Sequence, residues 1–238
     1  MTITVAIDGP AGAGKSTVAK QAAAALGYTY IDTGAMYRAV AWKALQTSVA
    51  PDNAAGLTEI AQTMALFLSP LSADGMQTVS VDGADVTEAI RTPEVSALTS
   101  TISALPPLRR VLVARQRQMG REEVHGVVLD GRDIGTVVFP NANVKIFLTA
   151  SAEERARRRC EELQGRGLTA DFAQVLREQI ERDTRDSQRE DSPLAIAAGA
   201  TVLNTDGLTV LQVAEQIIAL CRAKRPEKPE EKTAEKTG

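Results

Sequence analysis

The sequence has few aromatic residues and no large excess of charge of either sign. Phe, Trp and Tyr together make up 3% of its 238 residues, so its core must be built mainly from Ala, Val, Leu and Ile. The length allows one sizeable core, or a core with small appended lobes. The net charge of -3 excludes a general electrostatic attraction to nucleic acid or to an anionic membrane. Any site for an anion must therefore be a local cluster of basic groups.

Export signals, membrane spans and a disulfide framework are also missing from the sequence. The N-terminus breaks at Asp8-Gly9-Pro10 and lacks the basic flank and the apolar length of a signal peptide. No apolar stretch approaches the length that crosses a bilayer. The two cysteines, Cys160 and Cys221, form neither a metal-ligand pattern nor a disulfide pattern. We expect a cytoplasmic monomer with no nucleic-acid or membrane partner.

Short apolar segments alternate with segments rich in helix formers along most of the chain. We predict strands at residues 3–7, 28–31, 127–130, 144–148 and 201–203. We predict helices at residues 17–26, 35–46, 107–120, 152–163, 171–187 and 209–223. Alternating strands and helices predict a three-layer α/β fold, with a mostly parallel sheet that is covered on both faces.

Residues 51–107 differ from this pattern. They contain a predicted helix at 57–68 and a hairpin formed by 77–81 and 84–86 around Asp82-Gly83. A second helix is predicted to begin at Thr92-Pro93, with the threonine as its N-cap. We interpret this section as a lobe inserted between the second and third core strands. At the other end, residues 224–238 are almost entirely Lys, Glu, Pro and Thr, which predicts a disordered tail.

A glycine-rich turn follows the first predicted strand and matches the phosphate-loop pattern G-x-x-x-x-G-K-[ST]. Its glycines let backbone N–H groups curl around a phosphate, and the next helix directs its N-terminus at the same anion. Lys15 can bridge the β- and γ-phosphates, and Ser16 offers a hydroxyl to Mg²⁺. A chance turn is the alternative, but the flanking strand and helix favour binding of nucleotide phosphates. The predicted ATP-binding residues are Gly9, Pro10, Ala11, Gly12, Ala13, Gly14, Lys15, Ser16 and Thr17.

A phosphate loop alone leaves kinases, GTPase switches and motor-type ATPases open. A GTPase needs an N-K-x-D motif to read guanine, and the most similar segment, Asn204-Thr205-Asp206-Gly207, has threonine in place of the lysine. A second signature typical of transport ATPases is also lacking. The remaining motifs favour transfer of a phosphoryl group to an acceptor.

Arginines gather in four groups, although the chain as a whole is slightly acidic. The groups are Arg109, Arg110, Arg115, Arg117 and Arg121; Arg132 with Asp130 and Asp133; Arg155, Arg157, Arg158, Arg159 and Arg166; and Arg182, Arg185 and Arg189 with Asp186. Each group could instead be a solvated or ion-paired surface without a function. For Arg115, Arg117 and Arg121 this explanation is at least as good as a role in binding. Four groups in one phosphate-loop protein favour a cleft for two polyanionic substrates, because guanidinium groups fit phosphate oxygens.

The groups predict particular roles. Asp130 follows the third core strand, where it can hold Mg²⁺ together with Ser16. Arg155 and Arg159 share one helix face before a glycine-flanked turn, which suits a lid that closes over ATP. Asp186 can accept a hydrogen bond from a ribose hydroxyl. The predicted catalytic residues are Lys15, Arg132, Arg155, Arg159 and Arg182.

Several segments together resemble the bacterial cytidylate kinases, from residue 3 to about residue 219. They are residues 7–17, Asp-Thr-Gly-Ala-Met-Tyr-Arg at 32–38, Arg-Thr-Pro-Glu-Val at 91–95, Asp-Gly-Arg-Asp-Ile-Gly-Thr-Val-Val-Phe-Pro at 130–140, Lys-Ile-Phe-Leu at 145–148 and Glu-Arg-Asp-Thr-Arg-Asp at 181–186. The segments at 32–38, 130–140 and 181–186 are specific to that family, whereas the phosphate loop is shared much more widely. Thr33 stands where serine is frequent, which keeps the hydroxyl.

The resemblance implies the Mg²⁺-dependent reaction of ATP with CMP or dCMP, and it implies which residues contact the acceptor. Those residues are Thr33, Arg38, Ser100, Arg109, Arg132, Asp133, Arg182, Asp186 and Arg189. Within this set, Ser100, Arg109 and Asp133 would read the cytosine. The phosphate would be held by Arg38, Arg132 and Arg189, and the sugar by Arg182 and Asp186.

The resemblance also divides the chain into parts. Residues 1–33, 106–153 and 171–223 would form the core, 34–105 the monophosphate-binding region with its insert, and 154–170 the lid. The attacking oxygen is an anionic phosphate, so no general base is needed, and we expect the single histidine, His125, to be structural. The alternatives are a kinase for UMP, AMP or a small hydroxylated acceptor, and a nucleotide-binding switch.

Overall fold

A five-stranded parallel sheet forms the centre of the computed structural model, which describes residues 2–224. Its strands are β1 (Thr4–Asp8), β2 (Thr29–Asp32), β6 (Val127–Gly131), β7 (Val144–Thr149) and β8 (Thr201–Asn204), in the order β2-β6-β1-β7-β8. Each neighbouring pair is parallel. The predicted α/β fold with a parallel sheet is therefore confirmed, and β1, which leads into the phosphate loop, occupies the middle of the sheet.

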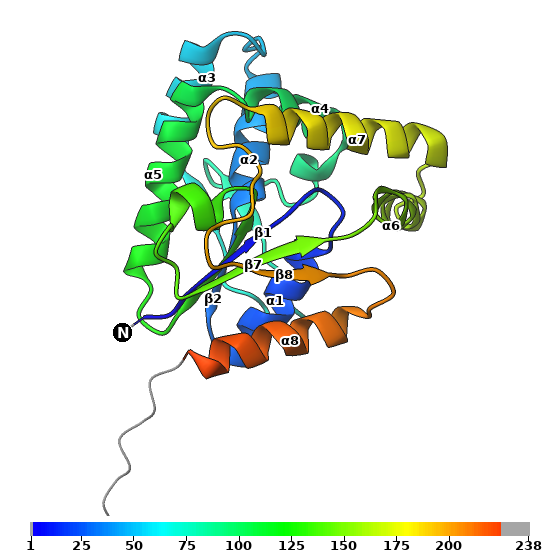
Figure 1. Cartoon of the computed structure of the whole chain (residues 1–238). Helices are drawn as coiled ribbons and strands as arrows, with labels where there is room; N and C mark the ends of the chain where they lie inside the picture. The colour runs from blue at the N-terminus through cyan, green and yellow to red at the C-terminus, as the bar shows by residue number, and fades with distance from the viewer. Residues whose placement is uncertain (1, 225–238) are drawn as a thin grey trace, which may run out of the picture.

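Helices cover both faces of the sheet because alternate residues of each strand point to opposite sides. Val5 and Ile7 of β1 lie in one core cluster with residues of α1 (Lys15–Leu26) and α8 (Val210–Ala223), two helices that pack side by side (Figure 1). Ala6 lies in another cluster, together with Val113 of α5 (Pro106–Glu122). The core rests mainly on small and aliphatic residues, as the low aromatic content predicts.

The inserted section between β2 and β6 forms a lobe with a core of its own. Its elements are α2 (Thr33–Gln46), α3 (Ala54–Thr63), β3 (Leu66–Leu68), β4 (Val79–Val81), β5 (Ala84–Asp85), η1 (Ala89–Arg91) and α4 (Pro93–Ile102). The predicted hairpin around Asp82 is confirmed, and it belongs to an antiparallel sheet ordered β3-β4-β5. The predicted start of α4 is confirmed too, because the Thr92 side chain accepts a hydrogen bond from the Val95 amide.

The helix predicted at residues 57–68 is wrong at its end. Helix α3 stops at Thr63, and the next residues form β3, in which Leu66 pairs with Val81. Arg115 of α5 donates hydrogen bonds to the carbonyl oxygens of Ala61 and Met64 at the end of the helix. The partner strand and Arg115 are both distant in the sequence, so the local apolar pattern could not reveal this boundary.

Two helices, α6 (Ala152–Gly165) and α7 (Phe172–Gln188), lie beyond the carboxyl end of the sheet, and α7 runs back towards the inserted lobe (Figure 1). They pack on each other through the small cluster of Ala156, Cys160 and Val175. A π-helical turn, η2 (Ile134–Val138), follows β6 and was not predicted. No helix in the described part of the chain has the length and apolar character needed to cross a membrane. Of the predicted tail, 225–238 lie outside the described residues.

Candidate active site

The phosphate loop makes a tight approach to the sheet that only glycine permits. Gly9 has φ 147°, and a Cβ placed there would lie 2.1 Å from the carbonyl oxygen of Leu148 in β7. Gly14 has φ 85°, in the left-handed region, and leads directly into α1. No side chain of the described residues caps the N-terminus of α1. Its first amides are therefore available to an anion.

Lys15 is buried at the start of α1, and its Nζ donates a hydrogen bond to the carbonyl oxygen of Pro10 at 2.7 Å. Burial lowers the pKa of Lys15 well below its usual value, and the positive charge of Arg132 lowers this pKa further. A bound phosphate would favour the protonated amine again. The position of Lys15 is thus suited to binding an anionic ligand.

Ser16 and Asp130 meet at the carboxyl ends of the strands. The Ser16 hydroxyl donates to Oδ2 of Asp130 at 2.7 Å, and the Tyr30 hydroxyl donates to Oδ1 at 2.8 Å. Burial raises the pKa of Asp130, and the neighbouring carboxylate of Asp32 raises it further. The sequence did not predict Tyr30 as a site residue, because nothing in the residues of β2 indicates that the Tyr30 side chain contacts Asp130.

This pair fits a magnesium ion, which commonly takes one or two protein oxygens and completes its shell with phosphate and water. Among residues 2–224, no three His, Cys, Asp or Glu side chains gather into a group that could hold a metal by themselves. Ser16 and Asp130 supply a hydroxyl and a carboxylate beside the phosphate loop. The donor set therefore suits Mg²⁺ that is shared with a nucleotide, and not a metal enclosed by protein ligands.

Arginine–carboxylate pairs make up the opposite side of the site. Arg109 of α5 and Asp133, which follows β6, form a buried ion pair. Arg38 of α2 donates to Asp32 at 2.8 Å, and Thr33 donates to the carbonyl oxygen of Asp130 at 2.5 Å. Arg38 and Thr33 belong to α2 of the inserted lobe, and Asp32 and Asp130 belong to core strands, so these two contacts tie the lobe to the core.

A second set of pairs centres on Asp186 of α7. Arg132 donates to its carboxylate at 3.1 Å, and Arg189 lies 3.8 Å from the other oxygen while donating to the carbonyl oxygen of Ser192 at 2.6 Å. Burial acts to raise the pKa of Asp186, but Arg132, Arg182 and Arg189 outweigh it, so this pKa is lowered. The carboxylate of Asp186 thus interacts with three guanidinium groups. Arg185, which was predicted on the same helix face, is exposed.

Arg182 differs from the paired arginines. Among the described residues its Nε has no hydrogen-bond partner, although the atom is buried. Burial, and next the charge of Arg132, lower the pKa of Arg182 to about 10. The charges of Arg132 and Arg182 both act on Lys15, so these two arginines lie near the phosphate loop. An unpaired cation in such a setting is suited to receive an anion.

Further buried polar atoms without a partner within residues 2–224 belong to residues of the predicted site or next to it in the sequence. They are the hydroxyls of Tyr37 and Ser100 and the Nε atoms of Arg38, Arg109 and Arg189. Tyr37 was not predicted as a site residue, although it stands in a segment that carries the resemblance. Its ring centroid lies 5.7 Å from the guanidinium carbon of Arg109, and burial raises the pKa of its hydroxyl. The signal that could have found it is its spacing of four from Thr33, which puts both on one helix face.

The lid region touches the phosphate loop through one of its two predicted arginines. Arg155 of α6 donates to the carbonyl oxygen of Ala11 at 3.1 Å and pairs with Asp183 at 2.6 Å. Arg159 instead pairs with Glu162 of its own helix at 2.7 Å. Arg158, which received no separate role, donates to the backbone oxygen of Thr205 at 2.7 Å.

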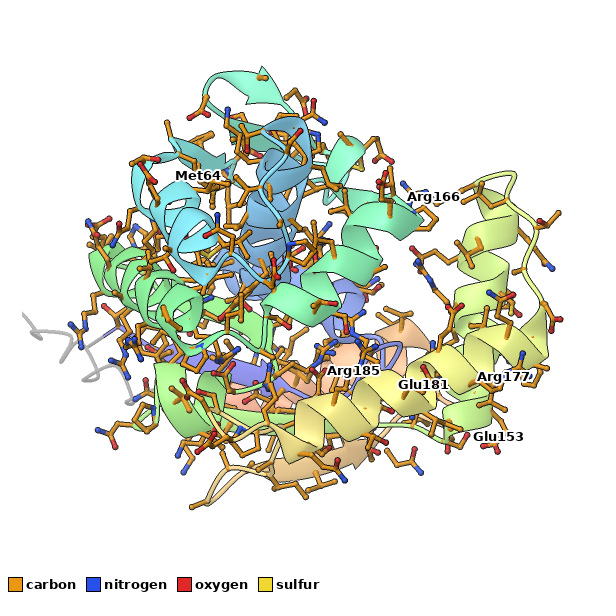
Figure 2. The ribbon with its side chains drawn as sticks, turned by 90° about the horizontal axis from the view of Figure 1, so that it is seen from above. Met64, Glu153, Arg166, Arg177, Glu181 and Arg185 are labelled. Carbon is orange, nitrogen blue, oxygen red and sulfur yellow. The ribbon has the colours of Figure 1, made fainter. Side chains whose placement is uncertain are left out.

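The turn after α6 reaches the inserted lobe. Figure 2 shows Arg166 at the end of α6, pointing across to the lobe. Its guanidinium group lies 2.6 Å from the carboxylate of Glu88 and 3.1 Å from the carbonyl oxygen of Arg91. The segment predicted as a lid thus contacts the inserted lobe.

The family model described as cytidylate kinase matches residues 5–223. The chain belongs to this family. A cytidylate kinase of Caldanaerobacter subterraneus subsp. tengcongensis is 48% identical over 222 residues, which are 93% of this chain and 96% of that protein. A bifunctional pantoate ligase/cytidylate kinase of Synechococcus elongatus is 51% identical over 92% of this chain, which spans 42% of that longer protein.

Among solved structures, an uncharacterized protein of Eubacterium ventriosum has a similar fold. Its TM-score is 0.51 and its identity 13%, with 94% of this chain and 99% of that chain covered. At this identity the similarity concerns the fold alone. The cytidylate kinase family therefore rests on the sequence match over nearly the whole chain.

Other residues of this cytidylate kinase family member lie outside the site. Arg115 and Arg117 are not simply solvated, since Arg117 holds the carbonyl oxygens of Val137 and Val138. Arg110 and Arg121 are exposed on α5. Thr17 remains a predicted ATP-binding residue, exposed at the start of α1 like Ser16 before it. Arg177, Glu181 and Arg185 follow one another along α7 in Figure 2, and all three are exposed. His125 is exposed before β6, at the end of the strand opposite the phosphate loop.

Proposed function

We propose that the protein transfers the terminal phosphoryl group of ATP to CMP or dCMP and forms ADP with CDP or dCDP. The observation that carries the proposal is the cluster formed by Lys15, Arg132 and Arg182. The charges of Arg132 and Arg182 lower the pKa of Lys15, and the charge of Arg132 lowers the pKa of Arg182. Two phosphate-bearing substrates repel each other, and a shared group of cations offsets that repulsion.

The donor nucleotide would lie along the phosphate loop. The free amides at the start of α1 and the Lys15 amine would bind its phosphates, and Arg155 would bring the lid to the loop through Ala11. Mg²⁺ held by Ser16 and Asp130 would offset phosphate charge. A lid that closes over these groups excludes water, which suppresses hydrolysis of ATP.

The acceptor base would bind between α2, α4 and α5. The Asp133 carboxylate can accept from the exocyclic amine of cytosine, and Arg109 and Ser100 can donate to its ring nitrogen and carbonyl oxygen. Uracil has a carbonyl oxygen where cytosine has the amine, so it would face the carboxylate with like polarity. Leaving such a buried polar group unpaired costs enough to discriminate between bases. Tyr37 would add its ring as a wall of this pocket.

The acceptor phosphate would bind to Arg38, Arg132 and Arg189, and the sugar would lie beside Arg182 and Asp186. In the chemical step an acceptor phosphate oxygen forms a bond to the γ-phosphorus, while the bond from that phosphorus to the β–γ bridging oxygen breaks. The nucleophile is already an anion, so no proton has to be removed first. Positioning and charge stabilisation supply the catalysis. Every residue of this site comes from one chain, so a monomer would suffice.

The proposal is tested with a panel of acceptors, using coupled detection of ADP. CMP and dCMP should give kcat/KM values well above those of UMP, AMP and small hydroxylated acceptors. A value for CMP that does not exceed those for UMP and AMP would overturn the substrate assignment. Slow hydrolysis of ATP that no monophosphate changes would favour the nucleotide-binding switch instead.

A further inference from the structure

Asp8 is a buried carboxylate at the carboxyl end of β1, directly before the phosphate loop. It is 3% exposed, and the strand register places it beside Gly131 at the end of β6. Its Oδ1 accepts a hydrogen bond from the Ile134 amide and its Oδ2 accepts one from the Gly135 amide, each at 2.7 Å. Both oxygens are thus engaged by successive backbone N–H groups of η2.

Keeping an ionised carboxylate at this buried position costs desolvation free energy. Burial and, to a smaller extent, the charge of Asp133 raise the pKa of Asp8 to about 6, although the two amides and the charge of Lys15 act to lower it. Within residues 2–224 no ion pair offsets the charge of Asp8. The two amides offset part of this cost, because an apolar residue at position 8 would leave both buried N–H groups without a partner. The contact therefore fixes where the backbone of residues 134 and 135 lies.

The two amides belong to the residues that follow Asp133. The backbone oxygen of Asp133 in turn accepts hydrogen bonds from the amides of Val137 and Val138, so the π-helical turn begins at this residue. Asp8 therefore holds the turn on the side of the phosphate loop, while the Asp133 side chain pairs with Arg109 on the other. The direction of the Asp133 carboxylate depends on both contacts.

We propose that Asp8 is a positioning residue for recognition of the acceptor base. By fixing the first turn of η2 through two amides, it aligns Asp133 with Arg109 and holds this pair in a constant position relative to the phosphate loop. The inference rests on the proposed function, in which Asp133 reads the base. It assigns to Asp8 a contribution to base selectivity that requires no contact with either nucleotide.

Gly135 offers a way to disturb the same contact from the other side. A Cβ added to Gly135 would lie 3.3 Å from Oδ2 of Asp8 and 3.1 Å from the Cβ of Ala197. Both distances are shorter than an ordinary van der Waals contact, so an alanine would press the turn away from Asp8. The change adds only one methyl group and leaves the charge of Asp8 in place.

The experiment measures kcat/KM for CMP and for UMP, the KM for ATP and the thermal unfolding temperature of Asp8→Asn and Gly135→Ala. In Asp8→Asn an amide NH₂ would face one of the two backbone N–H donors. We expect the ratio of kcat/KM for CMP to that for UMP to fall about tenfold in both variants, as expected for the loss of one hydrogen bond to a charged group. The KM for ATP should stay within about twofold, because the phosphate loop itself is unchanged. Glu215→Gln, the same chemical change at an exposed position of α8, should alter none of these values.

Asp133→Asn separates the failure of this inference from that of the proposed function. If Asp133→Asn leaves the CMP to UMP ratio unchanged, the assignment of Asp133 to the base is wrong. If Asp133→Asn lowers the ratio but Asp8→Asn and Gly135→Ala only lower the unfolding temperature, Asp8 is a structural residue and the inference is overturned. If Asp8→Asn does not fold, Gly135→Ala decides by the same ratio.

Discussion

The donor half and the acceptor half of the proposed active site are built in different ways. The donor half is made of consecutive residues, and its binding groups are largely backbone amides between β1 and α1. The acceptor half is made of side chains from α2, α4, α5, α7 and the end of β6, and carboxylates hold most of its arginines in place. Backbone amides need only a local turn, whereas side-chain charges from distant elements need partners to stay oriented.

Pairing also separates two kinds of arginine within the acceptor half. Arg38, Arg109 and Arg132 each have a carboxylate partner, while Arg182 is buried among like charges and has a lowered pKa. The paired groups contribute both to the fold and to binding. Lys15 and Arg182 are held for a ligand at a cost to stability. Changes at these two residues should therefore reduce activity without loosening the fold.

The largest effect is expected for Lys15→Ala. It removes the cation nearest to the transferred phosphate, so kcat should fall on the order of a thousandfold or more. The lysine amine is buried with a lowered pKa, so its loss should leave the unfolding temperature unchanged or raise it. Steady-state kinetics and thermal unfolding check both parts. A near-normal kcat would show that the donor half works without this charge.

The next largest effect is expected for Arg182→Met, which keeps much of the side-chain volume. We expect kcat/KM for CMP to fall by about a hundredfold, a size typical of removing one group that stabilises transition-state charge. The unfolding temperature should change little, since Arg182 forms no ion pair within residues 2–224 and Asp186 keeps its contacts with Arg132 and Arg189. The matched change Arg132→Met should lower both values, because it leaves Asp186 without its partner. Equal unfolding temperatures for the two variants would contradict the distinction between them.

Asp186→Ala tests how a carboxylate can serve both the sugar and the arginines. Arg132 and Arg189 lose their shared partner, so activity with CMP and with dCMP should fall together. CMP should lose roughly a further tenfold, the cost of one hydrogen bond to a charged group. Kinetics with both acceptors measure the difference. If activity with CMP and with dCMP falls by the same factor, Asp186 does not bind the ribose hydroxyl.

A pH series of unfolding compares wild type with Asp8→Asn. In the folded protein the pKa of Asp8 is raised from 3.8 to about 6, so the stability contributed by its protonated form is lost as the pH rises through this window. Asp133 and Lys15 are the charged side chains that act on Asp8, and the variant keeps both residues. The unfolding temperature of wild type minus that of the variant should therefore decrease between pH 3.8 and about 6. A difference that does not vary with pH would contradict the raised pKa.

The smallest effect is expected for the contact between lid and insert. The Arg166–Glu88 ion pair is largely exposed, and such pairs contribute little, so Arg166→Ala should change kcat/KM by only about twofold. A double-mutant cycle with Glu88→Ala isolates the pair, with the exposed Arg177→Ala as the control on α7. Additive effects of the two substitutions would show that this contact does not help to close the site.

Much of the fold could be predicted because its signals are local. The five core strands, the glycine-rich turn and the Thr92 cap each depend on residues within a few positions of one another. The boundary between α3 and β3 could not be predicted, because it depends on the pairing of Leu66 with Val81 and on Arg115. The π-helical turn after β6 was missed for the same reason, since Asp8 holds it from another strand.

The sequence by itself determined the phosphate loop and the residue types of the acceptor site, because a short motif carries both the turn and its chemistry. The tertiary structure alone decided which arginines are paired and which stand free, because this depends on carboxylates from other elements. It brought Tyr30 to Asp130, Tyr37 to Arg109 and Asp8 to the turn beside Asp133. It also paired Arg159 with Glu162 of its own helix. Burial sets the electrostatics of these groups, and no local pattern of residues encodes burial.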